Sequence, residues 1–311
     1  MTPRPVIWVT EPIHNDALAL LRANADLLGP GEFPAERAAD VTAVIVRAKP
    51  IDAALCARLP SLRIVGKHGA GLDNIDLREM RARGIEVMRA EGTNADSVAD
   101  LAIVFAMMLL RSPDLVDRQI RAGEALDATL KIGFEVSERR IGILGMGAIG
   151  RAVAKRLSHG FGATISGYDP QLPAPLWPAD VHRHSAFESL LTQSDLLFLH
   201  LPLLPETTNL ITAEALALMP KGAILVNCAR GGIVDEQALA GALASKHLAG
   251  AASDVFAQEP PTLENPLLAQ GLRFIATPHL GASTHAGLRR TGMVIAQRVL
   301  AAFDDNKGSQ T

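Results

Sequence analysis

A glycine-rich segment near the middle of the chain has the residue types that bind a dinucleotide. Gly145, Gly147 and Gly150 match the pattern G-x-G-x-x-G, with a strand-like apolar run before them and a helical pattern after them. The first glycine permits a tight turn, the second lets a pyrophosphate approach the backbone, and the third lets the helix pack close to its strand. The helix N-terminus also offers free N–H groups to phosphate. The segment therefore predicts a dinucleotide cofactor.

An acidic residue follows at the distance that the ribose of such a cofactor requires. Asp169 lies 19 residues after Gly150 (169 − 150), at the end of the next expected strand. A carboxylate at this point accepts hydrogen bonds from both ribose hydroxyls and repels a 2′-phosphate. The sequence therefore predicts NAD, rather than NADP, as the cofactor.

Three polar residues that could carry acid–base and anion-binding chemistry follow later expected strands. They are Arg230, Glu259 and His279. Ligands in open α/β sheets gather at the carboxyl ends of parallel strands, so we expect these side chains to lie together. Reduction of a ketone by a nicotinamide requires a proton donor at the carbonyl oxygen, and an anionic substrate requires a cation. His279 and Arg230 have these properties, and Glu259 could tune the histidine.

Together these motifs resemble the family of D-isomer specific 2-hydroxyacid dehydrogenases, from about Val44 to the end of the chain. Arg230, Glu259 and His279 stand in the order and at the spacing of that family's catalytic arginine, glutamate and histidine. The resemblance implies that His279 is the acid when a 2-keto acid is reduced and the base when the hydroxy acid is oxidised. It also implies that Glu259 binds the other ring nitrogen and favours the imidazolium, and that Arg230 grips the α-carboxylate.

The same resemblance implies further contacts with the cofactor and the substrate. The additional cofactor contacts are Ala148, Ile149, Leu201, Pro202, Thr207, Cys228, Ala229, Asp254, Gly281 and Ala282. The substrate contacts are Arg47, His68, Gly69 and Ala70, with Arg230 and His279. Small residues after His68 let backbone N–H groups approach a carboxylate closely. Whether His68 touches the substrate or only flanks it stays open, as does a surface role for Arg47.

Within the family, the segments at 46–47, 69–76 and 278–284 are most similar to the D-3-phosphoglycerate dehydrogenase branch. The chain ends soon after its last expected helix, so we expect a short form without a C-terminal regulatory domain. Lys49 and Lys67 replace residues typical of that branch, and with Arg47 they favour a dianionic substrate, such as 3-phosphoglycerate or sulfolactate. Two alternatives stay open. One is a reductase of hydroxypyruvate, glyoxylate or a lactate-type acid, and the other is a non-enzymatic, NAD(H)-sensing corepressor.

Short apolar runs alternate with helical patterns along two stretches of the chain, which predicts repeated βα units and parallel sheets. We expect strands at 6–9, 43–46, 63–66 and 85–88, and again at 140–145, 163–165, 195–200, 223–227, 250–255 and 273–276. The fold class is therefore α/β, with two doubly wound domains. One is a flavodoxin-like substrate-binding domain at 1–96 plus 287–311, and the other is a Rossmann NAD-binding domain at 97–286. The resemblance implies a homodimer built on the linking helices between about 97 and 125.

The composition excludes several other classes of protein. Hydrophobic residues make up 48% and aromatic residues only 4%, which is typical of covered parallel sheets built from Ala, Leu, Val and Ile. The net charge of −3 and the lack of long basic runs predict no nucleic-acid partner. Cys56 and Cys228 offer neither a disulfide framework nor paired metal ligands, so we expect no metal.

The termini and the apolar segments indicate where the protein acts. The first residues pass directly into a strand-like run, without the pattern of a signal peptide. The most apolar stretch, 101–110, is half the length needed to cross a bilayer and is bounded by charges. We therefore expect a cytoplasmic protein that does not engage a membrane.

Overall fold

The computed structural model describes residues 4–32, 35–269, 271 and 273–308. The chain divides into two compact units, Met1–Asn94 with Ala282–Thr311, and Ala95–Gly281. The domain boundaries expected from the sequence lie two and five residues later (96 − 94 and 286 − 281). The first difference has a physical reason, since Asp96 already pairs with Arg156 of the second unit at 2.9 Å.

The first unit is built on a five-stranded parallel sheet. Its strands are β1 (Val6–Val9), β2 (Asp26–Leu28), β3 (Val41–Val46), β4 (Ile64–Lys67) and β5 (Glu86–Arg89). Its helices are α1 (Asn15–Asn24), η1 (Ala35–Asp40), α2 (Ala53–Arg58), α3 (Leu77–Ala82) and α10 (His285–Gly308). The strand order β2-β1-β3-β4-β5 is that of flavodoxin, as predicted.

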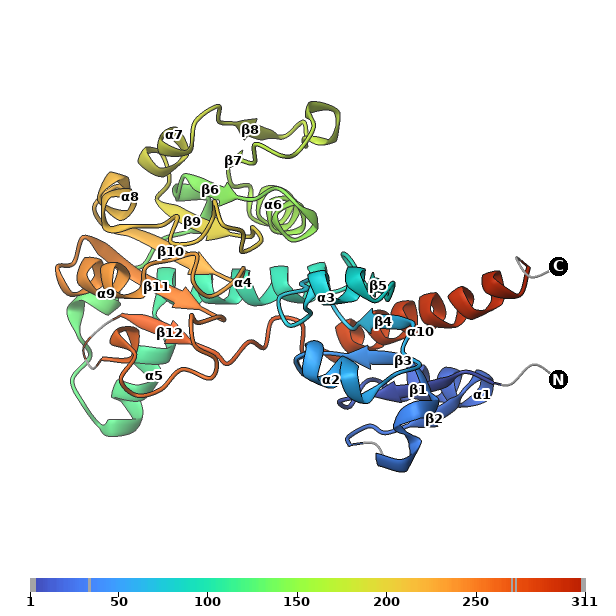
Figure 1. The fold of residues 1–311 in the computed structure, drawn as a ribbon. Helices are drawn as coiled ribbons and strands as arrows, with labels where there is room; N and C mark the ends of the chain where they lie inside the picture. Colours follow the sequence, from blue (N-terminus) through green and yellow to red (C-terminus); the bar gives the residue numbers. More distant parts are fainter. Residues whose placement is uncertain (1–3, 33–34, 270, 272, 309–311) are drawn as a thin grey trace. The chain divides into compact units, whose positions relative to one another are not determined.

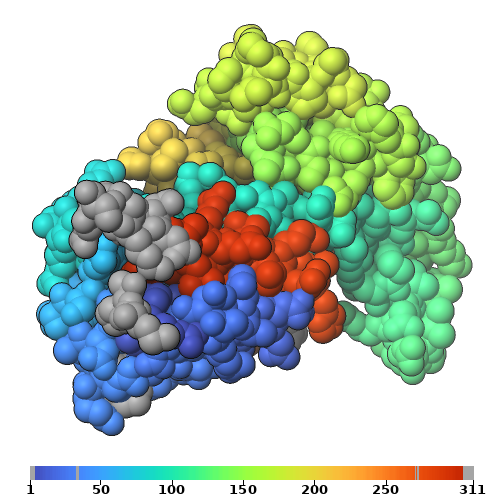
Figure 2. Space-filling view, turned by 90° about the vertical axis from the view of Figure 1, so that its right-hand side faces the viewer, coloured from blue at the N-terminus to red at the C-terminus, as the bar shows by residue number. Residues whose placement is uncertain are grey.

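Helices cover both faces of this first sheet, which explains why its strands are apolar on both sides (Figure 1). Ile7 and Val9 pack with α1 and α10, whereas Trp8, between them, packs with α2 and α3. Gly66 of β4 permits the close approach of α10, because a Cβ there would lie 2.7 Å from Cγ2 of Val299. Figure 2 shows α10 in red against the blue residues of the N-terminal segment, so both ends of the chain build this unit.

The second unit contains a seven-stranded parallel sheet. Its strands are β6 (Ile141–Leu144), β7 (Ile165–Tyr168), β8 (Val181–Arg183), β9 (Leu196–Leu199), β10 (Ala223–Asn227), β11 (Leu248–Ser253) and β12 (Phe274–Ala276). All strands are parallel, and their order is β12-β11-β10-β9-β6-β7-β8. From β6 the chain adds β7 and β8 on one side and then crosses to add β9 and the later strands on the other side. That is the doubly wound Rossmann order with one strand added, and its switch point is where such sheets bind ligands. The predicted fold class is thus confirmed.

Helices also cover both faces of the second sheet. The helices of the second unit are α4 (Ala95–Arg111), α5 (Pro113–Ala122), η2 (Ala128–Leu130), η3 (Val136–Glu138), α6 (Ala148–Phe161), η4 (Ala174–Leu176), α7 (Phe187–Thr192), α8 (Ala213–Leu218), α9 (Glu236–Ala244) and η5 (Pro266–Leu268). Residues of α4 and α6 pack with Ile143 and Phe198 on one face, and residues of α7, α8 and α9 pack with Leu197 and Leu225 on the other. None of the helices in the described part of the chain combines the length and apolar character of a membrane span.

The expected elements differ from the structure mainly at the edges. The sequence pattern missed β2 and β8, which have three residues each and lie at the edge of their sheets. A strand this short shows too few alternating positions to stand out from a loop. The last helix extends from His285 to Gly308.

Candidate active site

The glycine loop between β6 and α6 has the shape that a pyrophosphate needs. Gly145 has φ of +92°, and a Cβ there would lie 2.5 Å from the carbonyl oxygen of His200. A Cβ on Gly150 would lie 2.1 Å from the carbonyl oxygen of Gly145, whereas a Cβ on Gly147 would meet no heavy atom within 4 Å. The loop is therefore packed tightly beneath and open at Gly147, the N-cap of α6. These residues fit a dinucleotide, with Ala148 and Ile149 in the first turn of the helix.

Asp169 follows β7 directly, and its carboxylate is hydrogen-bonded to the glycine loop. Its Oδ2 accepts the N–H of Met146 at 2.9 Å, and its Oδ1 accepts the N–H groups of Gln171 and Leu172 at 3.0 and 3.1 Å. Arg183 of β8 donates to the carbonyl oxygen of Asp169 at 3.2 Å. A carboxylate has about four acceptor positions, so these three bonds leave capacity for a hydroxyl. The contact of Asp169 with a ribose stays a prediction.

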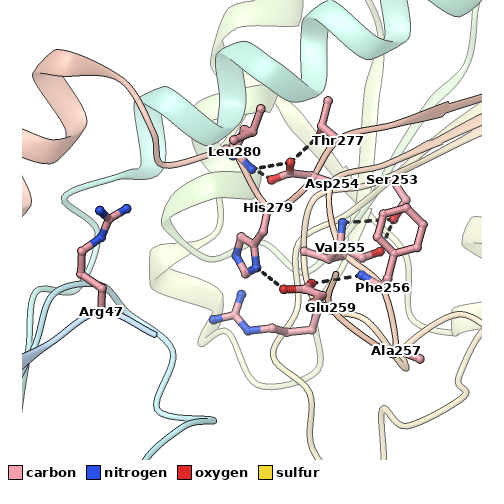
Figure 3. A network of polar contacts seen from close by, with 12 residues as sticks. Arg47, Ser253, Asp254, Val255, Phe256, Ala257, Glu259, Thr277, His279 and Leu280 are labelled. Carbon is pink, nitrogen blue, oxygen red and sulfur yellow. Dashed lines mark hydrogen bonds and ion pairs between the residues drawn. The ribbon is translucent and has the colours of Figure 1, made fainter. Parts of the chain in front are cut away.

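His279 and Glu259 are joined by a hydrogen bond, as the sequence motifs led us to expect (Figure 3). Nδ1 of His279 lies 2.9 Å from Oε2 of Glu259, and Oε1 of Glu259 accepts the N–H of Phe256 at 3.1 Å. Burial raises the pKa of Glu259, but the hydrogen bonds from His279 and Phe256 outweigh it and hold that pKa below its usual value. Glu259 is therefore an ionised acceptor that occupies Nδ1 of His279. Nε2 is the nitrogen of this ring that can bind a substrate.

Asp254 holds the backbone segment that carries His279. Its Oδ1 accepts the Thr277 hydroxyl at 2.6 Å and the Leu280 N–H at 2.7 Å, and its Oδ2 accepts the Gly281 N–H at 2.7 Å (Figure 3). The side chain is nearly fully buried. His279 has φ of +57°, an uncommon conformation for a residue with a side chain, and these bonds stabilise it. Asp254 therefore positions the histidine segment, while its contact with the cofactor stays a prediction.

Arg230 follows β10 and is placed by Asn227, the last residue of that strand. Oδ1 of Asn227 accepts the Ala229 N–H at 3.0 Å, and its Nδ2 donates to the carbonyl oxygen of Arg230 at 3.2 Å. Gly231 lets this turn pack against the Glu259 segment, since a Cβ there would lie 1.8 Å from the carbonyl oxygen of Phe256. The charge of Arg230 also helps to lower the pKa of Glu259. The second unit therefore brings together the three residues expected to catalyse.

Three further residues shape this site, although their sequence pattern predicted no role for them: Asn227, Gly231 and Thr277. Asn227 had a visible signal, because it is a polar residue at the carboxyl end of the apolar strand Ala223–Asn227. Gly231 and Thr277 lie beside predicted residues, but nothing in their own spacing shows which distant group each one contacts.

The remaining predicted cofactor residues of the second unit lie after β9 and β10. The Thr207 hydroxyl donates to the carbonyl oxygen of Pro202 and accepts the Leu204 N–H, each at 2.7 Å, which ties together the loop that begins at Leu201. Cys228 is buried, and burial raises the pKa of its thiol, so its backbone is the part that can bind a ligand. Ala229 is likewise buried. Their contacts with the cofactor stay predictions.

The predicted substrate residues of the first unit follow β3 and β4. His68 is only 8% exposed, its Nε2 has no hydrogen-bond partner among the described residues, and burial lowers its pKa to about 4. A Cβ on Gly292 of α10 would lie 3.6 Å from that nitrogen. The His68 side chain thus packs against α10, which favours the flanking role. Gly69 has φ of +149°, and both it and Ala70 are partly exposed.

Lys49 and Lys67, which also suggested a dianionic substrate, make contacts inside the first unit. Nζ of Lys67 donates to the carbonyl oxygen of Arg47 and to Oδ1 of Asn74. Nζ of Lys49 pairs with Glu32 and lies over the ring of Trp8 at 5.3 Å. These contacts indicate that the two lysines shape the segment around Arg47.

Comparison with known proteins agrees with this geometry. Residues 103–281 match the family model described as D-isomer specific 2-hydroxyacid dehydrogenase, NAD binding domain. The chain belongs to this family. The matched dehydrogenase domain includes the glycine loop, Asp169 and all three residues of the Arg230, Glu259 and His279 set. The protein is thus an NAD-dependent oxidoreductase of the 2-hydroxyacid dehydrogenase family.

Individual relatives show how far the similarity extends. The (S)-sulfolactate dehydrogenase of Chromohalobacter salexigens is 41% identical over 269 residues, which cover 85% of this dehydrogenase and 85% of that protein. The D-3-phosphoglycerate dehydrogenase of Methanocaldococcus jannaschii is 35% identical over 299 residues, which cover 94% of this chain but 56% of the relative. The crystal structure of a glyoxylate reductase from Paecilomyes thermophila matches with a TM-score of 0.84 at 29% identity, over 97% of this chain and 96% of that one.

Proposed function

We propose that this dehydrogenase transfers a hydride between NAD and C2 of a D-2-hydroxy acid, and that Arg230, Glu259 and His279 are its catalytic residues. The observation that carries the proposal is the 2.9 Å contact between Nδ1 of His279 and Oε2 of Glu259, beside Arg230. When bound, the cofactor would supply the hydride as NADH or accept it as NAD⁺. The glycine loop and Asp169, which fit a dinucleotide, would hold it.

The chemistry of the three residues follows from their contacts. In the direction of reduction, Nε2–H of His279 donates a proton to the carbonyl oxygen of the 2-keto acid, and in the direction of oxidation the same nitrogen takes the proton from the hydroxyl. Glu259 accepts from Nδ1, which fixes the orientation of the ring. Arg230 binds the α-carboxylate through two parallel N–H bonds.

We further propose that the substrate carries a second anionic group and that Arg47 binds it. Sulfolactate and 3-phosphoglycerate, named in two of the relatives, are both hydroxy acids with a second anion. Arg47 is only partly exposed, and its guanidinium donates through Nη1 to the carbonyl oxygen of Pro12 at 3.1 Å. A single charge-assisted hydrogen bond to the second anion is worth about 1.5–3 kcal/mol, which is roughly a tenfold preference or more.

The substrate class is tested by following NADH oxidation with a panel of 2-keto acids. Phosphohydroxypyruvate and sulfopyruvate represent dianions, whereas hydroxypyruvate, pyruvate and glyoxylate represent monoanions. We expect kcat/KM to be at least about tenfold higher for one of the dianions. Equal values for pyruvate and the dianions would contradict the dianion proposal in favour of a general reductase. NADH binding without turnover of any acid would favour a sensing role.

The assembly and location of the dehydrogenase are proposals as well. Five large apolar side chains between residues 104 and 134 are exposed in the second unit: Val104, Ile120, Leu126, Ile132 and Phe134. Exposed apolar surface of this kind supports a homodimer, in which a second copy covers it. Cys56 and Cys228 are free, buried thiols, which supports a reducing compartment, the cytoplasm.

A further inference from the structure

The segment that carries Arg47 is bound by a carboxylate from a neighbouring strand end. Oε2 of Glu11 accepts the N–H of Arg47 at 2.8 Å, and Oε1 accepts the N–H groups of Ala48 and Lys49 at 2.5 and 2.8 Å. Three successive N–H groups that converge in this way form a concavity suited to an anion. In this chain the anion is the side chain of Glu11, two residues after β1.

Glu11 is held there as an ionised group. Burial raises its pKa, but the hydrogen bonds from the Thr10 hydroxyl and from the three N–H groups outweigh burial and lower that pKa below its usual value. Hydrogen bonds to an ionised acceptor are about twice as strong as neutral ones. At neutral pH, hydrogen bonds to the Glu11 carboxylate therefore hold the backbone at 47–49 close to the end of β1.

The other polar groups of Arg47 are also engaged within the first unit. Its guanidinium donates to the carbonyl oxygen of Pro12, the residue after Glu11, and its own carbonyl oxygen accepts from Lys67. Asn74 completes the arrangement, since it accepts from Lys67 and donates to the carbonyl oxygen of Lys49 at 2.7 Å. The N–H, the carbonyl and the side chain of Arg47 thus each have a partner, and the segment Glu11-Pro12 supplies two of the three.

We propose that Glu11 is a positioning residue that fixes Arg47, and thereby sets the preference of the enzyme for substrates with a second anionic group. This inference rests on the proposed function, in which Arg47 binds that group. A side chain that is already oriented loses less conformational entropy when a ligand binds, so fixing Arg47 strengthens its contact with the anion. Glu11 does not touch the substrate and acts only through Arg47.

The expected effects separate this role from a general structural one. In Glu11→Ala the three N–H groups lose their acceptor, and we expect KM for the dianionic substrate to rise about tenfold with kcat nearly unchanged. KM for a monoanionic substrate should change by less than about twofold, because such a substrate has no group for Arg47. Glu11→Gln keeps one acceptor oxygen and should raise KM for the dianion at least about threefold.

A double-mutant cycle tests the inference. KM and kcat are measured for one dianionic and one monoanionic 2-keto acid with the wild type, Glu11→Ala, Arg47→Ala and the double variant. If Glu11 acts through Arg47, Glu11→Ala has no further effect in the Arg47→Ala background. Additive effects, or an equal rise of KM for both substrates, would overturn the inference. Glu79→Gln is the matched control, because it removes a carboxylate of the same unit that pairs with Arg83 on the surface.

The outcomes also distinguish the inference from the proposed function. If Arg47→Ala leaves the dianion preference intact, Arg47 does not bind the second anion, and both the proposed role of Arg47 and the inference fall. If Arg47→Ala abolishes the preference and Glu11→Ala keeps it, only the inference falls. Thermal unfolding shows whether each variant is folded. Should Glu11→Ala fail to fold, Glu11→Gln decides, and an unchanged KM for the dianion in that variant overturns the role of Glu11.

Discussion

At the scale of single residues, this chain uses histidines in two opposite environments. His279 is about half exposed and hydrogen-bonded to an ionised glutamate, which suits a group that gains and loses a proton during turnover. His68 and His200 are buried, and His200 has no hydrogen-bond partner for either ring nitrogen within the described residues. Burial lowers the pKa of His68 to about 4 and that of His200 to about 3. Both are therefore neutral in the folded protein.

The buried side chains of His68 and His200 predict a loss of stability in mild acid. Their pKa is lower in the folded than in the unfolded state, so their neutral forms favour folding above about pH 6.5 and this contribution is lost as the pH falls. At pH 5, each should reduce the free energy of unfolding by about 2 kcal/mol. Urea unfolding at pH 7.5 and pH 5 measures the difference.

Variants assign this effect to particular side chains. His200→Phe should remove its part of the pH dependence, whereas His159→Gln, at an exposed histidine, should leave it unchanged. Equal stability of the wild type at the two pH values would show that the buried histidines do not titrate in this way.

At the scale of elements, the glycine loop predicts two different outcomes for the same substitution. Gly147→Ala adds a methyl group where the structure has open space, so the protein should keep its thermal stability and lose most of its NADH affinity. Gly150→Ala adds a methyl group 2.1 Å from the carbonyl oxygen of Gly145, so it should lower the melting temperature as well. Thermal unfolding and NADH fluorescence titration measure both effects. Tight NADH binding by Gly147→Ala would contradict the assigned phosphate position.

Some elements and site residues could be predicted from the sequence alone, whereas contacts between distant segments could not. The long apolar runs and helical patterns were predictable, because parallel strands covered on both faces are almost wholly apolar. The set of Arg230, Glu259 and His279 was predictable because each residue follows a strand. The contacts of Glu11 with residues 47–49 and of Asp254 with residues 277–281 were not predictable from the sequence. They join distant parts of the chain and produce no periodic pattern of residue types.

At the scale of the whole molecule, the exposed apolar side chains between residues 104 and 134 predict a homodimer. The expected mass in solution is twice 33.0 kDa, or 66.0 kDa, as measured by light scattering after size-exclusion chromatography. Ile132→Glu, at a side chain that is 86% exposed, should shift the protein toward the monomer by placing a charge in the apolar interface. Leu263→Glu is the matched control, since Leu263 is 94% exposed elsewhere in the same unit. A wild-type mass of 33 kDa would contradict the dimer.

We propose that His279, oriented by Glu259, exchanges the proton that accompanies hydride transfer. The most direct test of this role is the rate of NADH oxidation by His279→Gln with the best 2-keto acid, with NADH affinity measured in parallel. We predict that kcat falls about 10²- to 10⁴-fold while NADH binding changes less than about twofold, because the substitution removes the proton donor and leaves the glycine loop intact. A His279→Gln variant that oxidises NADH at the wild-type rate would contradict this role of His279.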